Sequence, residues 1–350
     1  LIFVMLFYNV RIYFFIERIS TIMRFILLLL ISNFCLADLL ERKDVQTFIS
    51  ETANNTLLTE QEIKNYLSKA EIIQRVIRNR DNQPEVKFSW NRYRNIFLKQ
   101  SRIRDGVEFL ATHSELFKKI ENDFGVSKFY IASIIGAETN FGRNMGSLNP
   151  LDAIVTLTFE SNSKFWRKEL VQLLLLAREY SLDPKQMKSS WAGALGLGQF
   201  IPSSYLAYGV DYDKDGKVDM TNSIKDGIAS VANYLKVHGW QKDKLAIVPF
   251  EINDKFKKFD EEQIDSYDFP HKINNFRTRI SSEQMKAMEL TSSTYEGKAT
   301  PLLVVEGIES KLYLGFDNFI VITKYNRSSY YALVIHQLAL AISNEFNKNN

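Results

Sequence analysis

An almost unbroken run of apolar residues, from Val126 to Ala137, constrains the fold of this chain more than any other segment. Its apolar members are Val126, Phe129, Tyr130, Ile131, Ala132, Ile134, Ile135 and Ala137. A surface helix has one polar face, so this run predicts a helix that other elements enclose on most sides. A chain of 350 residues with 45% hydrophobic content has enough apolar material to enclose one.

A single carboxylate, Glu138, directly follows this run. An ionised carboxylate is seldom fully buried unless it is paired. Burial would raise the pKa of Glu138 into the range in which a general acid works near neutral pH. The alternative is a structural glutamate at a helix end, salt-bridged or solvated, and the local spacing does not decide between the two.

The charge balance argues against a nucleic-acid-binding protein. The formal net charge is +3, from 44 basic and 41 acidic residues. Residues 1–37 hold Arg11, Arg18, Arg24 and Glu17, which leaves 41 basic and 40 acidic residues beyond them. A net charge of +1 provides no charge-driven affinity for nucleic acid.

The leader segment, residues 1–37, predicts export to the periplasm. Met23 and Arg24 form a short basic start, residues 25–34 an apolar core, and Ala37 the small residue of a cleavage site. The alternative is membrane association through an uncleaved anchor, because residues 1–31 are long enough to span a bilayer, although four charged residues interrupt them.

Cysteine usage agrees with an exported protein. Cys35 is the only cysteine, and Phe34 before it does not suit lipid attachment. Cleavage after Ala37 would leave a chain with no disulfide and no thiol nucleophile. Such a chain must be stabilised by core packing in an oxidising compartment.

The order of patterns along the chain predicts an α+β fold that is mainly α. Residues 38–125 predict an N-terminal helical region, and residues 126–240 a core with helices near 127–138, 166–180 and 224–238. Residues 241–310 predict a small strand-rich α/β insert, and residues 311–350 the strands and helix that complete the core. Strands are expected at 246–248, 302–305, 311–314 and 319–323, and the last helix at 328–346.

A second dense segment, residues 189–205, has three glycines within six residues. Glycine lets the backbone approach a ligand closely. Ser190 and Gln199 offer neutral hydrogen-bonding groups, and Phe200 and Tyr205 offer flat apolar faces. A neutral groove with aromatic walls suits a sugar better than a charged metabolite. The alternative is a glycine-rich packing loop without a ligand.

Three long motifs, in order, resemble the membrane-bound lytic murein transglycosylase B family. They are GAETNFG at 136–142, SWAGALGLGQFIPSSY at 190–205, and SVANYL at 230–235 followed by HGW at 238–240. WNRY at 90–93 and YNRS at 325–328 resemble the early and late motifs of the family. The resemblance runs from about Trp90 to the end of the chain.

The resemblance implies a lysozyme-like catalytic core. Members cleave the β-1,4 bond between N-acetylmuramic acid and N-acetylglucosamine in peptidoglycan and leave a 1,6-anhydromuramoyl end. Glu138 matches the single acid and base of the family: it protonates the glycosidic oxygen, then activates the C6 hydroxyl of the sugar for attack on C1. Ordinary glycosidases need two carboxylates, and an internal nucleophile removes the need for the second.

The resemblance also implies the saccharide contacts. Ser190 matches a residue that contacts the acid and the acetamido region, and the other matches are Gln199, Tyr93, Tyr234, Tyr325 and Asn326. Leu197 departs from the family, which commonly has tyrosine there. An arginine pair that is expected to contact the acidic peptide stem is also missing, and Lys164, Arg167 or Lys168 are the candidates to replace it.

A calcium loop is predicted at residues 211–217, as a structural site and not for catalysis. Asp211, Asp213 and Asp215 occupy positions 1, 3 and 5, Gly216 occupies position 6, and Lys217 would ligate through its carbonyl oxygen. Position 12 holds an asparagine where the usual ligand is glutamate, and the resemblance implies closure by Asp226 instead. The alternative is an acidic, solvated turn.

Two rival functions remain open on the sequence alone. A hydrolytic muramidase would use Glu138 with a second carboxylate such as Asp152 or Glu160. A calcium-stabilised wall-binding protein would have no turnover. The expected partner is the glycan strand of peptidoglycan, with the cell-wall synthesis machinery as a further partner of a monomeric protein.

Overall fold

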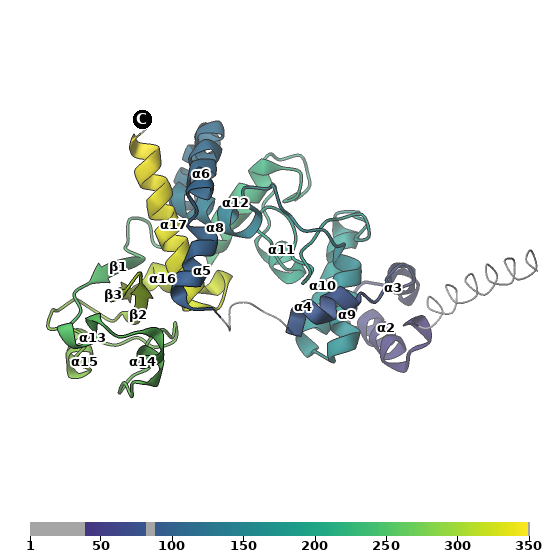
Figure 1. Ribbon diagram of the computed structural model, residues 1–350. Helices are drawn as coiled ribbons and strands as arrows, with labels where there is room; N and C mark the ends of the chain where they lie inside the picture. Colours follow the sequence, from purple (N-terminus) through teal and green to yellow (C-terminus); the bar gives the residue numbers. More distant parts are fainter. Residues whose placement is uncertain (1–38, 82–87, 349–350) are drawn as a thin grey trace, which may run out of the picture.

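The computed structural model describes residues 39–81 and 88–348. The predictions for the leader, residues 1–37 with Cys35, lie outside the described residues. The described chain is mostly helical, with one three-stranded antiparallel sheet (Figure 1). This architecture confirms the predicted fold class, α+β and mainly α.

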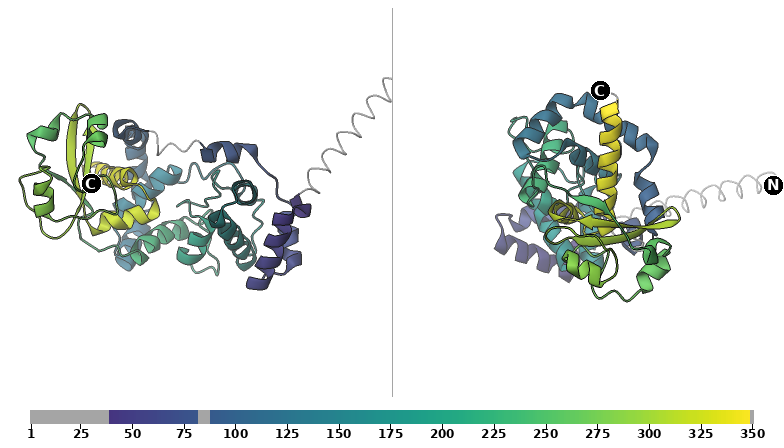
Figure 2. Two further views of the ribbon diagram at one scale, coloured as in Figure 1. Left: turned by 90° about the horizontal axis from the view of Figure 1, so that it is seen from below. Right: turned by 90° about the vertical axis from the view of Figure 1, so that its left-hand side faces the viewer.

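The helices around the predicted core form two groups, and α11 (Pro202–Tyr208) packs against both through α10 and α12. The first group is α2 (Lys43–Asn55), α3 (Glu60–Leu67), α4 (Gln74–Asp81), α9 (Pro150–Ser161) and α10 (Lys164–Glu179). The second group is α5 (Trp90–Phe97), α6 (Gln100–Thr112), α7 (Ser114–Phe124), α8 (Lys128–Thr139), α12 (Ile224–Val237) and α17 (Ser329–Lys348). Figure 2 shows the sheet and helices α2–α3 at opposite ends of the molecule.

The helical region predicted at 38–125 is not one unit. Its first helices lie on α9 and α10, where Phe48 meets Phe159 edge to face at 5.8 Å between ring centroids. Arg42 pairs with Glu160 at 2.6 Å across the same contact. Helices α5–α7 instead pack against α8, α12 and α17. Hydrophobic spacing predicts each helix but not the partner that its apolar face meets, so the helices of this region divide between the two groups.

The sheet has the strand order β1–β3–β2 and belongs to a unit with its own core. Its strands are β1 (Ile247–Phe250), β2 (Thr300–Glu306) and β3 (Glu309–Gly315), with helices α13 (Asp254–Lys257), α14 (Glu261–Ser266) and α15 (Ser282–Ala287) around them. Because β3 pairs with both other strands, the unit extends to Gly315, and the boundary expected at 310 falls inside a strand.

One predicted strand, residues 319–323, is wrong. These residues lie in α16 (Asp317–Tyr325), with Phe319, Val321 and Ile322 buried. A short continuous apolar run fits a buried strand and a buried helix equally well. Contacts with α12, α17 and β3 place α16 where the sheet unit joins the helical core.

Helix α8 is enclosed as the sequence predicts. Residues 131–136 are all buried, and α6, α7, α12 and α17 surround the helix. Ser127 caps its first turn by accepting the N–H of Phe129. Gly136 leaves room for the ring of Phe141, because a Cβ at position 136 would lie 2.5 Å from that ring. The helix ends at Thr139, so Glu138 stands in its last turn, at the edge of the core.

Candidate active site

Glu138 is half-buried, and the phenol of Tyr331 holds it in place. Tyr331 lies in the first turn of α17, is 3% exposed, and donates its hydroxyl to Glu138 Oε1 at 2.6 Å. Burial raises the pKa of Tyr331 well above its ordinary value, and the charge of Glu138 raises it further. The phenol therefore stays protonated and remains a hydrogen-bond donor to the carboxylate.

Sequence reasoning missed Tyr331. It lies beyond the YNRS motif at 325–328, in a helix expected only to complete the core. Its one visible signal is a phenol directly before an apolar run, residues 332–335, because a buried tyrosine hydroxyl needs a partner.

The glycine-rich segment is joined directly to the end of α8. Thr139 Oγ1 lies 3.0 Å from the carbonyl oxygen of Leu197. Leu197 itself is buried and would touch a Cβ at Gly142 or Gly227, so it belongs to the core and not to a ligand surface. Glu138 therefore lies one residue from the contact that fixes the segment against α8.

Ser190 and Gln199, both half-buried, are ordered by local backbone bonds. Ser190 Oγ accepts the N–H groups of Ala192 at 3.3 Å and Ala194 at 3.1 Å. Since both bonds use the oxygen as acceptor, the hydroxyl hydrogen is left to donate. Gln199 adopts a positive φ of 51° and its side-chain amide donates to the carbonyl oxygen of Gly196 at 3.1 Å.

Tyr325 and Tyr234 form an aromatic wall beside Tyr331. The rings of Tyr325 and Tyr331 are 6.4 Å apart and nearly parallel, at 8°. The ring of Tyr234 meets that of Tyr325 at 4.8 Å, edge to face. Their hydroxyls are engaged internally, since Tyr325 donates to the carbonyl of Gly198 and Tyr234 to that of Lys324. Both rings are covered by other aromatic side chains, Tyr234 by His238 at 4.1 Å and Tyr325 by Phe200 at 5.7 Å, so the wall is a packed layer that shapes the site.

Tyr93 and Asn326 flank this arrangement. Tyr93 is 4% exposed and packs against Trp90, Phe97 and Tyr330. Its phenol lies close enough to Tyr331 to contribute to the raised pKa of that residue. Asn326 caps the C-terminal end of α16 and is half-buried.

The carboxylates proposed for a two-acid mechanism are both engaged elsewhere. Asp152 is 4% exposed, and both of its oxygens lie 2.9 Å from Lys185 Nζ. Its Oδ1 also accepts the backbone N–H of Glu71. Glu160 pairs with Arg42 at the end of the molecule that holds α2. Each of the two carboxylates is thus held in an ion pair with a basic side chain.

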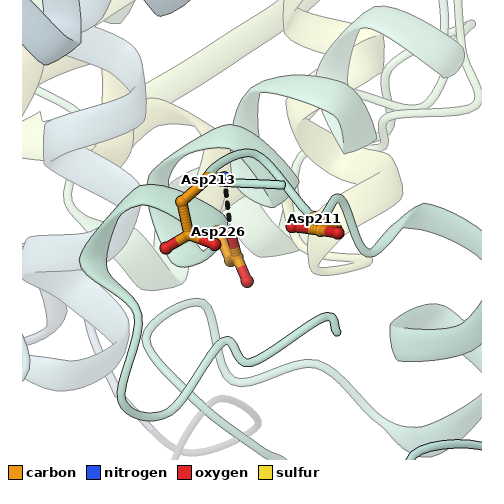
Figure 3. Close-up of side chains that lie close together, drawn as sticks. All are labelled: Asp211, Asp213 and Asp226. Carbon is orange, nitrogen blue, oxygen red and sulfur yellow. Dashed lines mark hydrogen bonds between the residues drawn. The ribbon is translucent and has the colours of Figure 1, made fainter. Parts of the chain in front are cut away.

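The predicted calcium loop gathers three carboxylates, drawn in Figure 3. Asp211, Asp213 and Asp226 each offer one oxygen, and these oxygens lie within 4.8 Å of one another. Asp226 is 1% exposed, and its pKa is raised by burial and by the charge of Asp213. Asp215 is not part of this group, and its carboxylate accepts the N–H of Lys217. The donors are oxygens only, the ligand type that calcium prefers.

A protein-family model for the transglycosylase SLT domain matches residues 41–340. The chain belongs to this transglycosylase family, a family of enzymes. The membership confirms the predicted resemblance. Because the match begins at residue 41, it also includes helices that the sequence motifs did not reach.

Among its relatives, the transglycosylase is 33% identical to membrane-bound lytic murein transglycosylase B of Escherichia coli strain K12. That match extends over 321 residues, 87% of this chain and 84% of the relative. In the described part of the transglycosylase, no helix is both long and apolar enough to cross a membrane.

Solved structures share its fold. The E. coli lytic transglycosylase Slt35 in complex with calcium has a TM-score of 0.76 at 33% identity, covering 88% of this chain and 95% of that one. SltB3 of Pseudomonas aeruginosa in complex with NAG-anhNAM-pentapeptide has a TM-score of 0.71 at 26% identity, covering 84% of this chain and 77% of that one. The transglycosylase therefore has the fold of lytic transglycosylases, as the sequence predicted.

Proposed function

We propose that this transglycosylase cleaves the β-1,4 bond between N-acetylmuramic acid and N-acetylglucosamine in peptidoglycan and leaves a 1,6-anhydromuramoyl end. The observation that carries the proposal is a single half-buried carboxylate, Glu138, held by the buried phenol of Tyr331 beside a glycine-rich segment. The two rival carboxylates are bound in ion pairs, which favours one group acting twice over a two-acid hydrolysis.

The geometry suggests how the proton moves. Tyr331 donates to Oε1 and so orients the carboxyl group of Glu138, which carries the catalytic proton. Glu138 gives this proton to the glycosidic oxygen as the bond to C1 breaks, and the N-acetylglucosamine hydroxyl leaves. The resulting carboxylate then takes the proton of the C6 hydroxyl while O6 bonds to C1. Holding the internal nucleophile near C1 supplies the advantage of an intramolecular reaction.

The same proposal assigns the sugar contacts. Ser190 has a hydroxyl hydrogen left to donate, which suits an acetamido carbonyl. Gln199, Tyr325 and Tyr234 belong to the adjoining wall, where the two packed rings shape the groove for a pyranose. Tyr93 and Asn326 complete the set as residues that shape the two ends of the site.

We also propose a structural calcium ion at Asp211, Asp213 and Asp226, with the carbonyl oxygen of Lys217 as a further ligand. Three convergent carboxylates, one of them almost fully buried, place negative charge where a divalent cation would offset it. Asp215 orders the turn instead of binding the ion. The relative Slt35 in complex with calcium supports the assignment.

For the cellular setting, we propose that the leader directs the chain to the periplasm, where peptidoglycan strands are its partner. The proposal rests on the pattern of residues 1–37, with membrane anchoring as its alternative. There we expect the protein to be a monomer. We expect the cell-wall synthesis machinery to be a further binding partner.

The test is digestion of purified sacculi by the parent and by Glu138→Gln, with mass spectrometry of the products. The parent should release fragments lighter by one water than hydrolysed ones, and the variant should release almost none. Glutamine keeps the shape of the side chain but cannot exchange a proton, so the loss should be several orders of magnitude in kcat. Hydrolysed ends would identify a muramidase, and equal release by the variant would remove Glu138 from the mechanism.

A further inference from the structure

A basic pocket lies between the sheet unit and α16. Its volume is about 330 Å³, and its walls include Phe276, Arg277 and Arg279 on one side and Lys324 and Arg327 on the other. No acidic side chain lines it in the described chain. A concave site with four cationic groups favours an anionic ligand.

Most of this positive charge is not neutralised by the protein. Arg279 pairs with Asp317 at 2.7 Å and also donates to the carbonyl of Lys298. Arg277, Lys324 and Arg327 are exposed, and no carboxylate of the described residues forms an ion pair with them. Three cations around one pocket repel each other, so a bound anion would be stabilised by all three.

The pocket adjoins the proposed sugar site through the chain itself. Lys324 and Arg327 immediately flank Tyr325 and Asn326 in the sequence. The carbonyl of Lys324 accepts the hydroxyl of Tyr234, so this part of the pocket wall and the aromatic wall of the site share one hydrogen bond. A group attached to a sugar in the site could therefore extend to the pocket.

We propose that this pocket binds a carboxylate of the peptide stem carried by the muramoyl residue. The inference rests on the proposed function, which supplies a substrate whose stem is rich in carboxylates. Arginine forks suit carboxylates, and Phe276 adds an apolar surface for the stem side chains. The volume suits part of a peptide and not a whole stem.

The residues expected from sequence to contact the stem are less suitable. Arg167 pairs with Glu51 at 2.7 Å and lies over the ring of Phe48, so it faces α2. Lys164 and Lys168 lie in the first turns of the same helix, α10. We therefore assign the binding of the stem, in place of the missing arginine pair, to the basic side chains of the pocket beside α16.

The test compares two substrates: glycan strands with intact stems, and the same strands after an amidase has removed the stems. The variant is Arg277→Gln with Lys324→Gln. The control, Lys272→Gln with Lys286→Gln, removes the same charge from exposed positions of the sheet unit outside the pocket. On stem-bearing strands, the variant should raise KM about fivefold to tenfold, because two exposed ion pairs contribute modestly to binding. On stem-free strands, the variant and the control should both match the parent.

Two further measurements sharpen the result. Amidation of the stem carboxylates should raise KM for the parent as much as the variant does, and should change the variant little. Calorimetric binding of the free stem pentapeptide needs no turnover, so it tests the pocket even if the parent forms no anhydro product and the proposed function fails. Equal KM changes on both substrates, no change on either, or peptide binding that the variant leaves intact would overturn the proposal.

Discussion

At the scale of the residue, the site depends on one contact between Glu138 and Tyr331. A group that acts first as an acid and then as a base must keep its orientation while its charge changes. The phenol donates to the carboxylate, and its raised pKa keeps it protonated. The contact therefore persists in both charge states that the proposed mechanism gives to Glu138.

Tyr331→Phe should therefore lower kcat by about tenfold to a hundredfold with little change in KM, because a hydrogen bond to a charged group is worth about 1.5–3 kcal/mol. The matched control is Tyr330→Phe. Tyr330 lies in the same turn of α17 as Tyr331, but its ring packs against Trp90 and Tyr93 of α5. The measurement is anhydro-product release from soluble glycan strands. A Tyr331→Phe enzyme with parental kcat would contradict the positioning role.

The sequence singles out the proposed reacting group, but not the side chain that contacts it. Glu138 is visible because a carboxylate at the end of an apolar run is chemically anomalous. Tyr331 is not, because its partner is distant in the sequence and its own neighbours are ordinary core residues. Asp215 fits the spacing of a calcium ligand, yet its carboxylate turns to the N–H of Lys217. Spacing specifies which residues could bind an ion, and the folded loop determines which of their carboxylates converge.

At the scale of the element, the long helices follow from periodicity and the ambiguous runs do not. Helix α8 ends within a residue of its prediction, whereas the apolar run at 319–323 is helical and not extended. Asp317 precedes that run and lies in the first turn of α16, where an acidic residue favours a helix start. The burial of the run does not distinguish a helix from a strand. The partners of α2–α4 also required the structure, because an apolar face does not specify its neighbour.

The loop at 211–226 yields an element-scale prediction. Calcium should raise the Tm of the parent, because an ion that binds only the folded state stabilises it, by about 2.7 kcal/mol at a hundred times Kd. Asp213→Asn should lose this response, since it removes one of the three convergent carboxylates. Asp215→Asn is the control and should retain it. The check is thermal unfolding with calcium and with a chelator, and equal responses in all three proteins would count against the site.

At the scale of the whole molecule, the helical core is held together around α8 and α17. His336 lies in this core, 5% exposed, with Nδ1 2.6 Å from the hydroxyl of Tyr130. Burial lowers the pKa of His336 to about 4, from an ordinary value of 6.5. The folded state therefore holds this ring neutral in a pH range where the unfolded chain protonates it.

The free energy of unfolding should therefore decrease as the pH is lowered. The contribution of His336 is fully present above pH 6.5 and is lost progressively as the pH falls toward about 4, by up to about 3 kcal/mol. His336→Gln keeps a hydrogen-bonding side chain but cannot titrate, so its stability should depend less on pH across this window. Urea unfolding at a series of pH values measures both slopes, and parallel slopes would show that His336 does not titrate as expected.

The position of Tyr331 has a consequence for the timing of biosynthesis. Glu138 is made before α17, and during synthesis the earlier helices can begin to fold while α17 is still absent. The phenol that orients the acid arrives with the last described helix. An emerging chain thus holds the carboxylate that we propose as the reacting group before it holds the phenol that contacts it, and we expect no cleavage of peptidoglycan until α17 has been synthesised and has docked.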